Sequence, residues 1–96
     1  MKAVTIEAIT PAEAITLTEV SVPEVKLGWV LVRIRAFGLN HSEQMLRQEE
    51  IEASYIQRPA IPGIECVGEV ANPGDARFVR EQRVCALNKN RSLSYY

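Results

Sequence analysis

The residues of this chain that are best suited to chemistry follow Gly38, in the polar run Asn40-His41-Ser42-Glu43. An alternating, strand-like segment precedes this run, and the run itself opens a polar, helix-like segment. Strand ends that turn sharply into a helix often carry function, because the scaffold on one side holds polar groups on the other in fixed positions. We therefore expect the functional site of the chain at this junction.

Asn40 also has a purely structural interpretation. Asparagine is a preferred N-cap residue, and Glu43 follows three positions later, which is an asparagine version of the capping-box spacing. A helix cap and a functional polar contact are compatible, so both interpretations stay open. The acidic residues 49, 50 and 52 are unfavourable near a helix C-terminus, and we expect a short helix that ends between Arg47 and Glu50.

Periodicity predicts the elements that must hold this junction in place. Alternation of apolar and polar residues, β-branched residues, and turn residues at the boundaries are typical of strands. By these signals strands are expected over residues 2–8, 15–22, 29–37, 64–71 and 83–87, with a loop over 54–62 and a turn over 72–75. Gly68 inside the fourth strand predicts a bulge or a close backbone approach. The polar segment 88–96 carries no further strand signal.

The length and composition indicate one small, mainly β domain. Ninety-six residues with 47% hydrophobic and 24% charged residues are typical of a folded globular chain. Five strands, one short helix and turn-rich connections predict a small open β-barrel or a sandwich.

The charge balance excludes some classes of partner. Eleven basic and twelve acidic residues give a net charge of −1 without a basic cluster, which argues against a role in binding nucleic acid or an anionic membrane. There is no apolar run of about 20 residues and no apolar signal segment. We expect a cytoplasmic location.

The two cysteines, Cys66 and Cys85, lie in apolar, strand-like segments and do not form a CxxC pair. We expect two buried thiols, with a disulfide or a reactive pair as the less favoured alternative.

Five stretches of the sequence together resemble a known family. They read, in chain order, MKAV, EVSVPEV, WVLVRIRAFGLNHSEQMLRQ, RPAIPGIECVGEV and RVCAL. Over residues 1–87 the chain resembles the N-terminal part of the catalytic domain of medium-chain dehydrogenases/reductases, and most of all the zinc-independent quinone oxidoreductase branch. The resemblance implies a partial GroES-like open β-barrel with one short helix, and a single truncated domain over 1–96 without a Rossmann domain.

The resemblance also predicts that no metal is bound. Zinc-dependent members carry a cysteine where this chain has Asn40 and a histidine where it has Ile64. A catalytic zinc needs thiolate or imidazole ligands from several positions. Only Glu65 would remain, and His41, the sole histidine, cannot replace the missing ligands.

In this branch the asparagine that matches Asn40 lies in a cleft near the nicotinamide ribose and the substrate, and a hydride passes from NADPH to a quinone or an activated double bond. The cofactor carries that chemistry and the protein positions the reacting atoms. The resemblance therefore implies a cleft whose wall residues are Asn40, His41, Glu43, Met45, Ile51 and Glu65. No residue is assigned a catalytic role.

This chain departs from the branch in ways that argue against catalysis by the chain alone. Met45 and Ile51 stand where aromatic residues often line the substrate side, and Glu81-Gln82 replaces a Gly-Asp turn. The sequence contains no GxGxxG, so it offers no visible dinucleotide site, and we expect no cofactor to be bound by this chain alone.

Two further expectations concern partners. Missing strands would leave open edges and exposed core, so we expect a homodimer in which two copies cover one another. The alternative is a binding module for a small apolar ligand or a partner strand. A role as a co-chaperone rests on fold analogy alone and is disfavoured, because no mobile glycine-rich loop is evident.

Overall fold

The computed structural model describes residues 1–87. Their order along the chain is β1 (Lys2–Val4), η1 (Ala12–Ala14), β2 (Leu17–Glu19), β3 (Val30–Phe37), α1 (His41–Gln48), η2 (Glu50–Glu52), β4 (Glu65–Pro73) and β5 (Arg83–Leu87). This confirms the predicted mainly β fold with one short helix. The expectation for residues 88–96 lies outside the described part of the chain.

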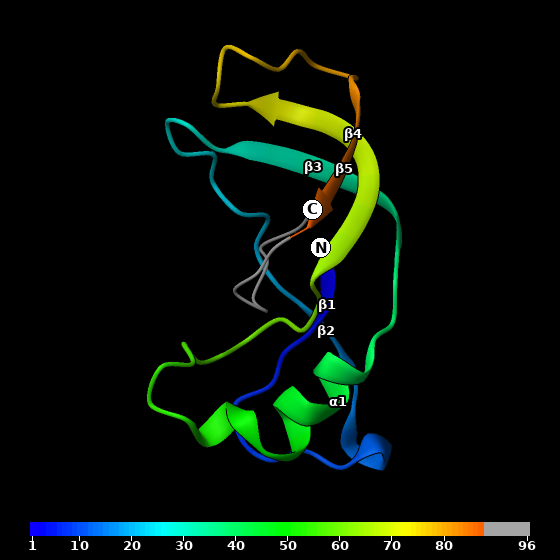
Figure 1. Cartoon of the computed structure of the whole chain (residues 1–96), viewed down its shortest axis with the longest axis vertical. Helices are drawn as coiled ribbons and strands as arrows, with labels where there is room; N and C mark the ends of the chain where they lie inside the picture. Colours follow the sequence, from blue (N-terminus) through cyan, green and yellow to red (C-terminus); the bar gives the residue numbers. More distant parts are fainter. Residues whose placement is uncertain (88–96) are drawn as a thin grey trace.

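The described strands form two antiparallel sheets, one of β1 and β2 and one in the order β3-β4-β5. The molecule measures 39 × 24 × 23 Å. Figure 1 shows the three-stranded sheet at one end of the long axis and α1 at the other, with the short β1–β2 ribbon between them. The connection from β3 to α1 therefore joins the two ends of the molecule.

The strands β3 and β4 pair along most of their length, with two register shifts, one between Leu31 and Val32 and one beside Gly68. Ile34 pairs with Gly68 and Ala36 with Val67, so Arg35 is an extra residue on β3. A Cβ atom on Gly68 would overlap the backbone carbonyl oxygen of Arg33. Both the predicted bulge and the predicted close backbone approach are confirmed.

The hydrophobic core at the helical end contains the buried residues Ile6, Leu46, Ile51 and Ala60. The backbones of Ile6 and Ala60 exchange two hydrogen bonds, at 2.8 and 2.9 Å. The first strand was expected over residues 2–8 but β1 ends at Val4, and Ile6 pairs with Ala60 in an isolated bridge instead of with β2.

The second strand is also shorter than the expected 15–22. Only Leu17–Glu19 pairs with β1, and the side chains of all three residues are exposed. Alternation in the sequence continues beyond Glu19, and the backbone of Val20 exchanges hydrogen bonds with Met1 at 2.7 and 2.8 Å, but no described strand lies opposite residues 21–22. A segment with strand-like alternation forms a strand only beside a partner strand, because its backbone N–H and C=O groups form hydrogen bonds with the neighbouring strand.

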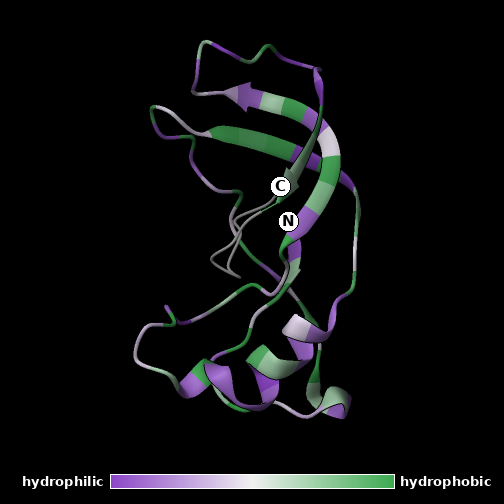
Figure 2. Cartoon of the chain, in the orientation of Figure 1, coloured by the Kyte–Doolittle hydropathy of each residue, from purple (hydrophilic) through white to green (hydrophobic). Residues whose placement is uncertain are grey.

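Figure 2 shows apolar bands separated by polar residues along β4, whereas the burial of its side chains alternates. Cys66, Gly68 and Val70 are buried, whereas Val67 on the opposite face is exposed. Cys66 is buried as expected, but the expectation for Cys85 was wrong because Cys85 is exposed. Cys85 pairs with Val67 and therefore lies on the other face of the sheet from Cys66.

Candidate functional site

The candidate site is centred on the contact between Gly38 and Glu65. Gly38 follows the last residue of β3, and Glu65 is the first residue of β4. A Cβ atom on residue 38 would overlap Oε1 of Glu65. Glycine at this position lets the carboxylate lie directly against the backbone where β3 ends.

Asn40 links this carboxylate to the start of α1. Its Nδ2 donates a hydrogen bond to Oε1 of Glu65 at 3.0 Å. Its backbone N–H donates to Oε2 of Glu43 at 2.6 Å. Asn40 and Glu43 form a capping box, in which the asparagine side chain faces the backbone N–H of Glu43. The predicted helix cap is confirmed, and Asn40 bridges two carboxylates that are 22 positions apart in the sequence.

The helix start suits these charges. Glu43 lies in the first turn of α1 and Arg47 in the last, and both placements are favourable for the helix dipole. Arg47 also donates from one guanidinium nitrogen to the carbonyl oxygen of Thr10 at 3.1 Å. The hydrogen bond ties the C-terminal half of the helix to the segment that follows β1.

An apolar cavity of about 470 Å³ lies beside these carboxylates. The β1–β2 ribbon, the end of β3 and residues 61–63 supply its walls. Its apolar lining includes Val4, Leu17, Ile34, Phe37 and Leu39. Glu43 and Glu65 also line it, and Oε1 of Glu43 is buried without a hydrogen-bond partner within residues 1–87. The cavity thus combines an apolar body with carboxylate oxygens.

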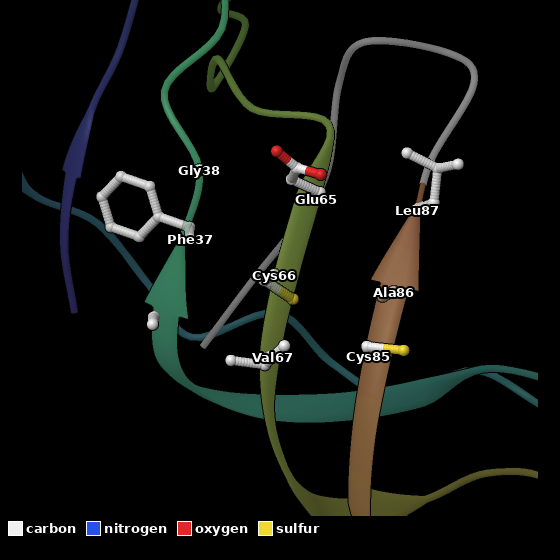
Figure 3. A pocket seen from close by; sticks show the side chains of 9 residues that line it. Phe37, Gly38, Glu65, Cys66, Val67, Cys85, Ala86 and Leu87 are labelled. Carbon is white, nitrogen blue, oxygen red and sulfur yellow. The ribbon is translucent and has the colours of Figure 1, made fainter.

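A second, shallower pocket lies across the ends of β3, β4 and β5, and Figure 3 shows the side chains that line it. The carboxylate of Glu65 points toward Gly38 in this view, while Val67 and Cys85 lie further down the two neighbouring strands. Phe37, Gly38 and Glu65 line both pockets, so the two pockets adjoin each other at the contact between Gly38 and Glu65.

The structure brings together three of the residues predicted to form the cleft: Glu43 and Glu65 line the cavity, and Asn40 hydrogen-bonds both of them without lining it itself. His41 is exposed at the first position of α1. Met45 is 37% exposed and is absent from the cavity lining. Ile51 is fully buried in the core beside Leu46, because η2 turns its side chain inward against the helix.

The metal prediction concerns the same residues. Within residues 1–87 no three histidine, cysteine, aspartate or glutamate side chains gather in an arrangement that could hold a metal ion. Asn40 and Glu65 hydrogen-bond each other instead. Independence of zinc stays a prediction.

A strongly shifted pKa occurs elsewhere, in the turn after β4. Hydrogen bonds from the side chain and the backbone N–H of Arg77 lower the pKa of Asp75 from 3.8 to about 2. The same pairing raises the pKa of Arg77. This turn lies beyond the far end of β4 from Glu65, so we assign it a structural role.

Sequence patterns alone did not show two parts of the site. The contact of Gly38 with Glu65 joins residues in separate strands, and the only local signal was a glycine at a strand end. The contribution of Val4 and Leu17 to the cavity depends on how the β1–β2 ribbon lies against the β3–α1 junction.

The chain matches a known protein family over most of its length. Residues 26–94 match the model of the alcohol dehydrogenase GroES-like domain. The chain belongs to this family. The resemblance to the N-terminal GroES-like domain of medium-chain dehydrogenases/reductases is therefore confirmed.

Its relatives include the synaptic vesicle membrane protein VAT-1 homolog-like of mouse and human, each 33% identical over 76 residues. The match covers 79% of this chain and 18% of either relative. The chain thus spans less than a fifth of the length of the curated relatives it matches.

Solved structures show the same fold. The human VAT-1 homolog-like protein superposes with a TM-score of 0.79 and 31% identity, covering 91% of this chain and 28% of that one. An NAD-dependent alcohol dehydrogenase gives 0.75 and 28% identity, covering 88% and 25%. A quinone oxidoreductase of Pseudomonas syringae pv. Tomato DC3000 gives 0.73 and 24% identity, covering 91% and 28%, which shows the fold alone.

No helix within residues 1–87 is long and apolar enough to cross a membrane.

Proposed function

We propose that this chain is the N-terminal, substrate-side domain of a zinc-independent oxidoreductase that uses NADPH to reduce quinones or enones. The observation that carries the proposal is the linked set of Asn40, Glu43 and Glu65 beside an apolar cavity, in a domain of this family. An apolar body with a few fixed polar groups is the usual composition of a small-molecule site. The chain supplies the wall that holds the substrate.

The reaction needs a second component. NADPH supplies the hydride, and residues 1–96 hold no GxGxxG to bind its phosphates. The role of this chain is to orient the substrate and to exclude water through the apolar lining. On this proposal the chain alone is inactive, and its Asn40 side chain contacts the reacting molecule.

The test joins the chain to the nucleotide-binding domain of a quinone oxidoreductase and measures consumption of NADPH with a quinone. We expect no turnover by the chain alone and turnover by the joined protein, unchanged by a zinc chelator. Asn40→Ala should lower kcat/KM about tenfold, the equivalent of one lost hydrogen bond. Asn72→Ala, at an exposed asparagine of β4, is the matched control.

Activity that requires added zinc would overturn the zinc-independent part of the proposal. A joined protein that folds and binds NADPH but reduces neither quinone nor enone would overturn the proposed reaction. Stabilisation of the separate chain in a thermal shift assay by apolar ligands, with no response to NADPH, would favour a binding module instead.

A second candidate is self-association into a homodimer, and a particular surface supports it. Ala36, Val67, Cys85 and Leu87 are exposed and adjoin one another through the pairing of β3, β4 and β5. Val67 is 46% exposed and Leu87 71%. Exposed apolar patches of this kind often mark interaction sites, and we propose that a second copy covers this one.

A further inference from the structure

We propose that Glu65 is a positioning residue that fixes the orientation of the Asn40 carboxamide, so that Asn40 presents an N–H donor to a carbonyl oxygen of the substrate. The part of this inference that concerns the substrate rests on the proposed function. The part that concerns the orientation of Asn40 rests only on the contacts within the chain.

The first step is the position of Glu65. Glu65 is the first residue of β4 and pairs with Leu87 of β5, so the sheet fixes the backbone of Glu65. Gly38 has no side chain to keep the carboxylate away from the end of β3. The pairing with β5 and the space at Gly38 together place the carboxylate of Glu65 beside Asn40.

The second step is the chemistry of the pair. An ionised carboxylate only accepts hydrogen bonds, whereas a carboxamide has an accepting oxygen and a donating nitrogen. Oε1 of Glu65 lies 3.0 Å from Nδ2 of Asn40. A flipped carboxamide would place two acceptor oxygens against each other, so Glu65 selects the orientation in which Nδ2 faces it.

The third step is the other end of the carboxamide. In the capping box the side chain of Asn40 faces the backbone N–H of Glu43, which needs an acceptor. A flip would place the NH2 group against this N–H. The helix start and Glu65 therefore impose the same orientation, and reversing it would lose two interactions.

One N–H of the Asn40 carboxamide remains available to a ligand. The NH2 group of asparagine carries two N–H bonds, and Glu65 accepts one of them. Asn40 is only half-buried, and no acceptor within residues 1–87 takes its second N–H. A donor suits a ligand atom that accepts, such as the carbonyl oxygen of a quinone or an enone. Glu65 thus determines that the Asn40 carboxamide presents a donor, and not an acceptor, to the substrate.

The experiment follows the side-chain amide signals of Asn40 by NMR in the full chain. In the wild-type chain we expect one Nδ2 proton to be shifted downfield and to exchange slowly, because it is bonded to a charged acceptor. Glu65→Leu removes the acceptor, so the bonded proton should lose its extra downfield shift and exchange faster, and the two protons should keep only the ordinary difference of a primary carboxamide. Glu65→Gln, which can accept or donate, should reduce the extra downfield shift while the chain stays folded.

Glu69→Gln is the matched control, because it removes the same charge from β4, where Glu69 pairs with Arg35 instead. It should leave the Asn40 signals unchanged. Asn40 signals that are the same in the wild-type chain and in folded Glu65→Gln would overturn the positioning role of Glu65, and Glu65→Gln serves this purpose even if Glu65→Leu fails to fold.

The substrate part is tested by titrating cyclohexenone against cyclohexene, which has the same ring without the oxygen. We expect the free Nδ2 proton to shift with cyclohexenone only, and to shift less in Glu65→Gln. An equal response to both compounds, or none, would overturn the donor role toward a carbonyl. The positioning role is judged separately from the amide signals, and the proposed reaction from NADPH turnover of the joined protein.

Discussion

At the scale of the residue, the site depends on the missing Cβ atom of Gly38 and on the carboxamide of Asn40. Gly38 leaves the space that the Glu65 carboxylate occupies. Asn40 then uses its side chain for Glu65 and its backbone N–H for Glu43. The same asparagine caps the helix and bonds Glu43 and Glu65, which line the cavity, so the capping role is compatible with the proposed contact to a substrate.

Gly38→Ala should displace the Glu65 carboxylate and break its hydrogen bond with Asn40. We expect a loss of about 1–2 kcal/mol in the free energy of unfolding, because one bonded polar group loses its partner. Urea denaturation measures the loss. The penalty should shrink in the Glu65→Ala background, where no carboxylate is left to displace. An equal penalty in both backgrounds would mean that the strain comes from the backbone.

At the scale of the element, tight contacts at strand ends decide the geometry of the sheet. The bulge at Arg35 and the approach of Gly68 to the Arg33 carbonyl bend β3 against β4. At the other end of β4 the chain turns through Asp75 and Arg77, which share several hydrogen bonds. These features position β5, whose last residue lies opposite Glu65.

Asp75 should make the stability of this turn depend on pH. Its pKa falls from 3.8 to about 2 in the folded chain, so the folded state favours the ionised form. The resulting stabilisation is fully present above pH 3.8, decreases below it, and is lost as the pH falls through about 2. Arg77 is 80% exposed, so solvent screens the effect and we expect it to be small.

Thermal unfolding of the wild-type chain and of Asp75→Asn across this range tests the assignment. The difference in Tm should be largest near neutral pH, should shrink as the pH falls through 3.8, and should be lost only below pH about 2. A difference that stays constant over the whole range would show that the lost stability does not come from the ionised carboxylate.

At the scale of the whole molecule, the sheet end leaves apolar side chains uncovered. Phe37 is 65% exposed, and the patch of Ala36, Val67, Cys85 and Leu87 lies on one face of the same sheet. A folded domain of this size buries only a modest share of its surface. A covering surface from another chain would remove this patch from water.

We expect the chain to sediment as a dimer at micromolar concentrations, and Val67→Glu to shift it to the monomer because the charge would be buried in the interface. Val79→Glu, at an exposed valine outside the patch, should leave the dimer intact. A monomeric mass for the wild-type chain throughout this range of concentration would contradict the proposal, as would equal effects of the two variants.

The sequence by itself determined the elements whose signals are local. The helix begins at the predicted cap because Asn40 and Glu43 contact each other within one turn. Strands also form around Ile34 and Val70 as predicted, although the bulge at Arg35 interrupts the alternation of β3. Only the tertiary structure decided which side chains meet. It moved Ile51 into the core, exposed Cys85, and placed Glu65 against Gly38. Periodicity tells which face of an element is apolar, but the arrangement of elements decides what covers that face, and this depends on contacts between residues far apart in the chain.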